Sequence, residues 1–107
     1  MIRTPFEVRM ARAELYGIKH QKGFEMVLDA MAEVRLDKCS AYGERRYENP
    51  DLDFNRWMCY SDVYRKFIRL EQQMKFGSVS DLRETYMDLA NYAAMAIQLI
   101  DQGAFDV

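Results

Sequence analysis

The 107-residue sequence has few cysteines, histidines and prolines and no long apolar run. Its two cysteines, Cys39 and Cys59, match neither a zinc-ligand spacing nor a disulfide framework, so reduced thiols in a cytoplasmic protein are expected. The single histidine, His20, excludes a histidine-based zinc site. No segment reaches the ~18 uninterrupted apolar residues of a membrane span, and no signal-peptide cleavage site is visible. A membrane partner is therefore not expected.

Several catalytic motifs are missing as well. The sequence has no glycine-rich phosphate loop and no GxSxG elbow, and neither cysteine has a histidine arranged beside it. Fifteen Lys and Arg stand against seventeen Asp and Glu, a formal net charge of −2. This balance disfavours a nucleic-acid partner, because the cations form only one short stripe in a net-acidic chain.

Half of the residues are apolar or aromatic, enough for one all-helical domain spanning residues 1–107. Apolar periodicity predicts four helices, at about residues 5–16, 22–39, 53–76 and 80–101. Thr4 and Asp53 are the predicted N-caps of the first and third helices, and Gly17 and Gly77 the predicted stops. Ser78 with Asp81 predicts a capping box that opens the last helix. The fold class is all-α, a four-helix bundle.

The last helix is apolar on nearly all sides. One face carries residues at three- and four-residue steps, namely Leu82, Tyr86, Leu89, Ala93, Ala96, Ile97 and Ile100. Beyond Asn91 the opposite face is apolar too, with Tyr92, Met95 and Leu99. Such a helix is central to a bundle or shared with a partner subunit, so we expect a homo-oligomer, at least a dimer.

Charged stripes accompany three of the helices. The second helix repeats acids every four residues, at Glu25, Asp29, Glu33 and Asp37. The third carries the cations Arg65, Lys66 and Arg69, and the fourth carries Glu84, Asp88 and Asn91. Carboxylates one turn apart can share a hard cation such as Mg²⁺, and the cations would neutralise phosphates. The alternative is that the acidic stripe of the second helix and the basic stripe of the third are solvated faces, and periodicity alone favours this alternative.

Residues 40–53 break the periodicity and form a polar loop with an Asn-Pro turn signal. Its tyrosines Tyr42 and Tyr47 could stack on a nucleotide base or simply pack. The length of the loop favours a functional segment over a minimal connector.

Three blocks of the sequence resemble the nucleotide modification associated domain 1 family. They are KCSAYG from Lys38 to Gly43, DVYRKFIRL from Asp62 to Leu70, and LRETYMDLANYAAM from Leu82 to Met95. That family is common in phages and is related to the MazG-like all-α nucleotide pyrophosphohydrolases. The resemblance implies a MazG-like helical bundle that binds or acts on nucleotides, in the cytoplasm of a host cell if the chain is phage-encoded.

In the MazG-like group, carboxylates from two helices hold Mg²⁺ and water attacks a phosphate, which releases a nucleoside monophosphate and pyrophosphate. By resemblance, Asp88 and Glu84 match the acids of the last motif, and Lys66 and Arg69 match phosphate-contacting cations. Glu33 and Asp37 are chosen as the opposite acids from the helical ladder. The expected catalytic and metal residues are therefore Glu33, Asp37, Glu84 and Asp88. The expected substrate-binding residues are Lys38, Tyr42, Tyr47, Arg65, Lys66, Arg69 and Asn91.

Two departures from the family pattern favour a different function. The sequence has no EExxE block, and Ala41 stands where the family tends to carry an acid before Tyr-Gly. The alternative is a catalytically inactive helical phage protein that binds a nucleotide or inhibits a host protein. A purely structural homo-oligomer is a third interpretation.

Overall fold

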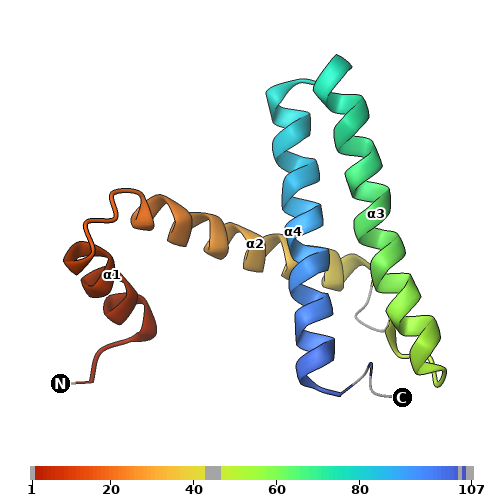
Figure 1. The fold of residues 1–107 in the computed structure, drawn as a ribbon, viewed down its shortest axis with the longest axis horizontal. Coiled ribbons are helices and arrows are strands. Elements are labelled where there is room, and N and C mark those ends of the chain that lie inside the picture. Colours follow the sequence, from red (N-terminus) through yellow and green to blue (C-terminus); the bar gives the residue numbers. More distant parts are fainter. Residues whose placement is uncertain (1, 43–46, 104, 106–107) are drawn as a thin grey trace. The chain divides into compact units, whose positions relative to one another are not determined.

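The computed structural model describes residues 2–42, 47–103 and 105. These residues form four α-helices and no strand: α1 Pro5–Leu15, α2 Gln21–Tyr42, α3 Leu52–Phe76 and α4 Val79–Asp101 (Figure 1). The all-α class and the four helices are thus confirmed, close to their predicted bounds. The MazG-like arrangement of the helices stays a prediction. None of the described helices is long and apolar enough to cross a membrane.

The chain divides into two compact units, Met1–Lys38 and Cys39–Val107. The first contains α1 and most of α2. The second contains the end of α2 with α3 and α4.

In the first unit, local chemistry fixes both ends of α1. Thr4 is the predicted N-cap: its hydroxyl accepts from the Glu7 N–H, and the Glu7 carboxylate accepts from the Thr4 N–H at 3.2 Å. At the other end Gly17 has a φ of 69°, a left-handed conformation that favours glycine. This turn lets the Ile18 N–H donate to the Ala13 carbonyl at 2.9 Å, which closes the helix as predicted.

An ion pair joins α1 to α2. The Arg9 guanidinium donates to both oxygens of Glu25, whose side chain is only 4% exposed. The hydrogen bond from Arg9 lowers the pKa of Glu25 and raises that of Arg9. Glu25 is therefore not part of a solvated acidic ladder, because α1 supplies the compensating charge. The remaining acids of the ladder, Asp29, Glu33 and Asp37, are exposed.

In the second unit, α3 begins at a different cap from the predicted one. Asp51, not Asp53, is the N-cap: its carboxylate accepts from the Asp53 and Phe54 N–H groups at 3.1 and 3.2 Å. Both acids precede the same apolar stripe, and the sequence pattern does not separate them. Buried Asn55 holds the incoming chain, because its side chain accepts from the Asn49 N–H and donates to the Asn49 carbonyl.

A two-residue turn, Gly77–Ser78, connects α3 to α4. Gly77 ends α3 and Ser78 caps α4, with the Ser78 hydroxyl and the Asp81 carboxylate forming the predicted capping box. An added Cβ at Gly77 would lie 2.7 Å from the Gln73 Cβ and 2.9 Å from the Gln73 carbonyl oxygen. Glycine is therefore required here by the close approach of the chain to Gln73. The two helices run antiparallel and pack along their length (Figure 1).

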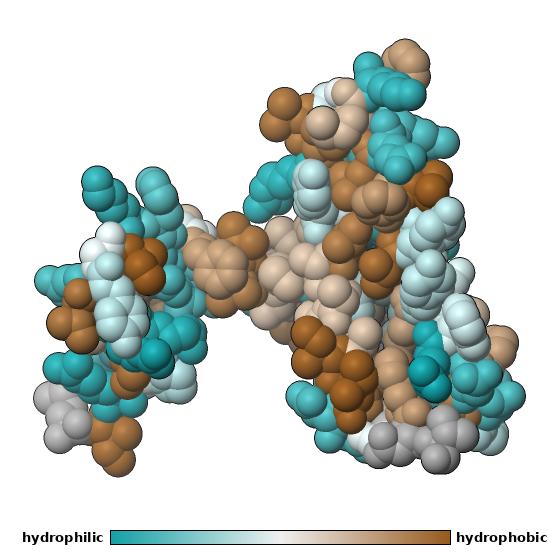
Figure 2. Space-filling view, viewed as in Figure 1, coloured by the Kyte–Doolittle hydropathy of each residue, from teal (hydrophilic) through white to brown (hydrophobic). Residues whose placement is uncertain are grey.

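The buried side of the α3–α4 hairpin is largely polar. The buried residues of α3 are Asn55, Cys59, Asp62 and Leu70, and those of α4 are Thr85, Met87 and Asp88. Three members of the predicted apolar core face, Tyr86, Ile97 and Ile100, are instead exposed. Figure 2 shows hydrophobic residues, in brown, at the surface of the protein. In the first half of α4, Thr85 and Asp88 face α3, where they contact Gln73 and Lys66.

Candidate functional site

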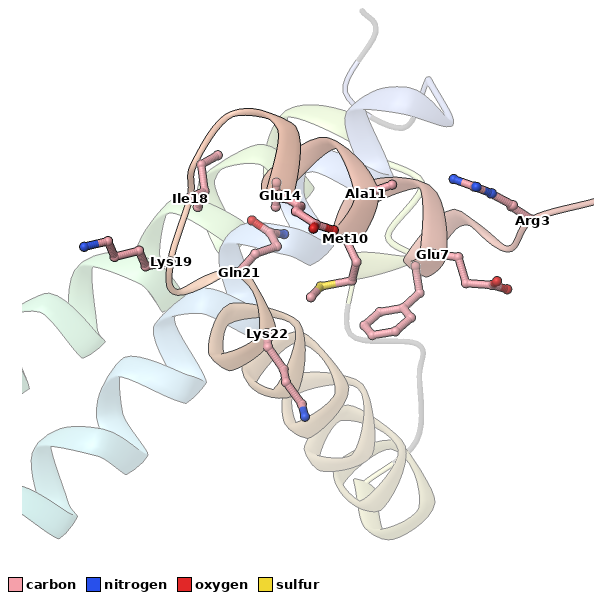
Figure 3. A pocket seen from close by; sticks show the side chains of 11 residues that line it. Arg3, Glu7, Met10, Ala11, Glu14, Ile18, Lys19, Gln21 and Lys22 are labelled. Atoms are coloured by element: carbon pink, nitrogen blue, oxygen red, sulfur yellow. The ribbon is translucent and has the colours of Figure 1, made fainter.

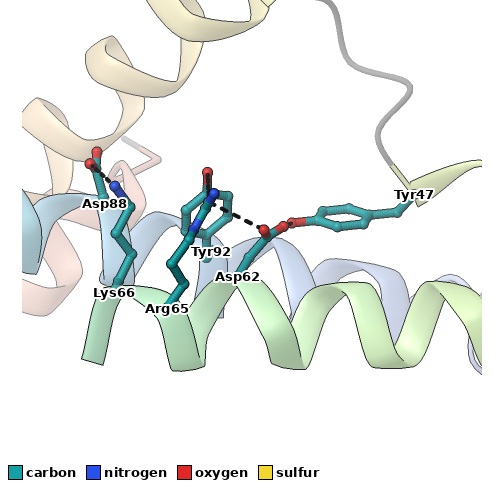
Figure 4. Close-up of polar contacts among 6 residues, drawn as sticks. All are labelled: Tyr47, Asp62, Arg65, Lys66, Asp88 and Tyr92. Carbon is teal, nitrogen blue, oxygen red and sulfur yellow. Dashed lines mark hydrogen bonds and ion pairs between the residues drawn. The ribbon is translucent and has the colours of Figure 1, made fainter. Parts of the chain in front are cut away.

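An ion pair between the two helices lies at the centre of the candidate site. The Lys66 Nζ on α3 is 3.0 Å from the Asp88 Oδ2 on α4, and both point toward one another (Figure 4). The Asp88 side chain is 9% exposed and that of Lys66 17%. Charges removed from water this far must be paired, so each residue compensates the other.

A second buried acid lies one turn before Lys66. The Asp62 side chain accepts a hydrogen bond from the Tyr47 hydroxyl at 2.6 Å, and the Arg65 guanidinium contacts its other oxygen at 3.3 Å. Arg65 also approaches the Tyr92 hydroxyl of α4 at 3.5 Å. Figure 4 shows these side chains in one row along α3. We call the row of polar contacts between α3 and α4, which includes Lys66–Asp88 and Arg65–Tyr92, the seam. Through its hydrogen bond to Asp62, Tyr47 links the segment before α3 to the seam.

The seam extends toward the hairpin turn. The Thr85 hydroxyl donates to the Gln73 side-chain oxygen at 2.7 Å. In the other direction, one turn beyond Asp88, the buried Asn91 side-chain nitrogen has no hydrogen-bond partner among the residues that the structure describes. Buried amide donors are normally satisfied, so this nitrogen is available to an acceptor that enters the site.

A basic hollow of about 530 Å³ opens beside this seam. Its walls are Arg65, Lys66, Ile68, Arg69, Gln72 and Gln73, all from α3. The three predicted cations therefore line one open hollow. Guanidinium groups bind phosphate oxygens through paired donors, and the glutamine amides add neutral donors. The hollow suits a polyanion such as a chain of phosphates.

The predicted acids fall into two separate sets. On α4, Glu84 lies one turn before Asp88 and is exposed, while Asp88 is buried. On α2, the acids Glu33 and Asp37 are exposed residues of the first unit, as is the predicted substrate-binding cation Lys38. Within the part of the chain that the structure describes, no three His, Cys, Asp or Glu side chains gather closely enough to hold a metal ion.

The predicted loop is only partly described. Tyr47 is buried against Asp62 and serves packing and hydrogen bonding. The end of the predicted loop nearest Tyr42 belongs to α2, but the Tyr42 side chain and residues 43–46 lie outside the described set. Whether Tyr42 stacks on a base stays a prediction.

Four residues of the site escaped sequence reasoning: Asp62 as a buried acid, Gln73, Thr85 and Tyr92. A signal for them does exist. On α4 the polar residues Thr85, Asp88 and Tyr92 are spaced by three and four residues. On α3 the polar residues Asp62, Lys66 and Gln73 are spaced by four and seven, so each set lies on one face of its helix. Two polar stripes with matching spacing on adjacent helices indicate a polar seam, but apolar periodicity takes precedence in ordinary sequence interpretation.

The first unit has a hollow of its own, of about 550 Å³, at the junction of α1 and α2. Figure 3 shows Met10 and Glu14 from α1, Ile18 from the connection, and Gln21 and Lys22 from α2 around it. Its lining mixes acids, cations and apolar groups without a buried polar cluster.

Comparison of the chain with family models, curated proteins and solved structures gives no match. The resemblance to nucleotide modification associated domain 1 consequently stays a prediction. The candidate site stands on the geometry of α3 and α4.

Proposed function

We propose that this protein binds a nucleoside triphosphate at the basic hollow of α3 and hydrolyses it to a nucleoside monophosphate and pyrophosphate. The observation that carries the proposal is the juxtaposition of three cations with the buried carboxylate of Asp88. A polyanionic substrate requires the cations, and hydrolysis of its anhydride requires oxygen ligands or a base close to the phosphates.

The phosphates would lie along Arg65, Lys66 and Arg69. Arg65 and Arg69 are exposed and one turn apart, so their guanidinium groups can contact neighbouring phosphates. Lys66 is held by Asp88 at the inner edge of the same hollow. The unpartnered Asn91 nitrogen would donate to a carbonyl of the base or to a phosphate oxygen.

The acids of α4 fit a hard cation. Glu84 and Asp88 offer carboxylate oxygens one turn apart, and Mg²⁺ typically needs only one or two carboxylates with water and substrate phosphates. When bound, Mg²⁺ would lower the pKa of water and neutralise developing charge. The α2 acids Glu33 and Asp37 are the proposed second pair, and this part of the proposal rests on the resemblance alone.

The chain's own groups would divide the remaining work. The cations of α3 bind and orient the phosphates, and Asp88 positions the Lys66 ammonium toward the hollow. The Tyr47 hydroxyl and the Arg65 guanidinium both contact the Asp62 carboxylate and thereby fix its position beside the hollow.

The test is a screen of nucleoside and deoxynucleoside triphosphates with Mg²⁺, with separation of the products. Glu84→Gln is the sharpest variant because Glu84 is exposed, so its loss leaves folding intact. Glu71→Gln, an exposed acid on α3, is the matched control. We expect monophosphate and pyrophosphate from the wild type and from Glu71→Gln, and at least a tenfold loss in Glu84→Gln. No turnover of any nucleotide by the wild type contradicts the enzymatic proposal.

A second candidate function is nucleotide binding without turnover, including inhibition of a host protein. The specific observation in its favour is the Lys66–Asp88 ion pair, which occupies the carboxylate that catalysis would need. The missing EExxE block and Ala41 point the same way. Calorimetric titration separates the two functions, because binding that is independent of Mg²⁺ and yields no product supports the second.

A further inference from the structure

A row of five aromatic side chains lies exposed along α3. Phe54, Trp57, Tyr60, Tyr64 and Phe67 recur at steps of three, three, four and three, so they share one face of the helix. We call this set the aromatic stripe. The exposed fraction of its members runs from 48% at Phe54 to 63% at Trp57.

The three central rings of the stripe contact one another. The rings of Trp57 and Tyr60 meet edge to face with centroids 5.8 Å apart, and those of Tyr60 and Tyr64 stack at 6.0 Å. Such pairs hold the side chains in place, so little conformational entropy remains to be lost when another surface covers them.

The stripe lies on the side of α3 that faces away from α4. Lys66 and Gln73, the α3 residues whose side chains contact Asp88 and Thr85 of α4, fall on the opposite side of the helix from the stripe. The hairpin therefore has polar groups inside and aromatic groups outside. A large exposed aromatic patch marks an interaction surface, and Trp and Tyr are the residues most enriched in interfaces.

We propose that two copies of this chain pack through the aromatic stripe, with their α3 helices antiparallel about a two-fold axis at Tyr64. The available area suits a dimer. Aromatic side chains of ~200 Å² each, about half exposed, present roughly 500 Å². A stable interface buries about 800 Å² per partner, and exposed Met74 with the flanking side chains supplies the remainder.

Charge and shape complementarity select a second copy in this register. Asp53 and Lys75 are both exposed and lie equally far from Tyr64 on opposite sides. Phe54 and Met74 are likewise equidistant from Tyr64. In an antiparallel pair centred on Tyr64, Asp53 of each copy therefore meets Lys75 of the other, and Phe54 meets Met74. An isologous interface requires this kind of self-complementarity.

Analytical ultracentrifugation of the full chain over a range of concentrations tests the proposal. We expect a dimer for the wild type, and at least tenfold weaker association for Tyr64→Glu, which places two like charges at the axis. Tyr86→Glu, at an equally exposed tyrosine of α4, is the matched control and should stay dimeric. A wild type that is monomeric at every concentration overturns the proposal, as does dissociation by Tyr86→Glu but not by Tyr64→Glu.

Two further measurements keep the test independent of folding defects. Asp53→Lys and Lys75→Asp should each weaken the dimer, and the double exchange should restore it, whereas failure of the double exchange contradicts the antiparallel register. Trp57 is the only tryptophan of the sequence, so its fluorescence reports on the stripe directly. Its emission should shift to shorter wavelength as the protein concentration rises, and a constant emission maximum argues against burial of the stripe by a second copy. The aromatic stripe lies on the side of α3 away from α4 and can form this contact whether or not the protein binds a nucleotide.

Discussion

The Lys66 ammonium on α3 lies 3.0 Å from the Asp88 carboxylate on α4, in a seam where both side chains are largely removed from water. This pair joins the basic hollow of α3 to the acidic start of α4. It also contributes to the antiparallel register of the two helices, because a shift of one turn would separate the two charges.

The pair should be strongly coupled in stability. Lys66→Met and Asp88→Leu are each expected to lower the free energy of unfolding by roughly 1 to 3 kcal/mol, because each removes the ion-pair partner of a charge that is largely out of water. The double variant should lose less than the sum of the two. Chemical denaturation of the four proteins measures the coupling. The control cycle is the exposed Arg56–Asp53 pair at 3.9 Å, measured at a protein concentration at which the chain is monomeric, and a coupling below about 0.5 kcal/mol is expected there. Equal couplings in the two cycles would contradict a structural role for the buried pair.

The hydrogen bond between Thr85 and Gln73 gives a second stability test. Thr85→Val keeps the shape of the side chain but leaves the Gln73 amide without its partner, which should cost about 1 kcal/mol. The double variant Thr85→Val with Gln73→Leu should recover most of that loss, because both polar groups are then removed together. Thermal unfolding followed by circular dichroism checks this. Additive losses in the double variant would mean that the two side chains do not interact.

Two glycines should respond to alanine in opposite directions. At Gly77 the new Cβ would meet Gln73 at 2.7 Å, so Gly77→Ala should destabilise the hairpin by about 1 kcal/mol or more. At Gly23 in α2 an added Cβ would meet no described atom within 4 Å outside the helix's own backbone, so Gly23→Ala should stabilise the chain by roughly 0.5 to 1 kcal/mol through higher helix propensity. Denaturation midpoints of the two variants decide the matter. A stabilising Gly77→Ala would disprove the tight turn.

The first unit should lose stability in acid. The hydrogen bond from Arg9 lowers the pKa of Glu25 below its ordinary value of 4.5. A lowered folded-state pKa contributes stability that is present above the ordinary value and is lost as the pH falls through the folded-state pKa. Hydrogen exchange of the α1 amides should therefore accelerate as the pH is lowered from about 5 toward 3, after correction for the intrinsic exchange rate. Glu25→Gln should accelerate exchange already at pH 7 and remove this dependence, whereas the exposed control Glu14→Gln should behave as the wild type does.

The helices could be predicted from the sequence because their signals are local. Apolar periodicity, the Thr4 and Ser78 caps and the stops at Gly17 and Gly77 each depend on residues a few positions apart, and the structure confirms them. The predicted cap of α3 is wrong by two residues, because Asp51 and Asp53 both lie where the apolar stripe begins and only the backbone geometry shows that Asp51 is the N-cap and Asp53 is already in the first turn.

The seam could not be predicted from periodicity in the same way. That reasoning assigns apolar residues to the inside, which would bury Tyr86 and expose Asp88, whereas the structure does the reverse. Lys66 and Asp88 were each identified as site residues, but their pairing depends on the register of two helices. That register follows from the short turn at Gly77–Ser78 and from the polar contacts of the seam, which are properties of the folded hairpin.

The central claim is that the hollow lined by Arg65, Lys66 and Arg69 binds the phosphates of a nucleotide. Isothermal titration calorimetry with a non-hydrolysable nucleoside triphosphate, in the presence and absence of Mg²⁺, tests it most directly. Arg69→Gln removes an exposed cation of the hollow, and Arg83→Gln removes an exposed cation of α4 outside it. The account predicts saturable binding by the wild type and by Arg83→Gln, with affinity at least tenfold weaker in Arg69→Gln. No binding by the wild type, or equal affinity in the two variants, would contradict it.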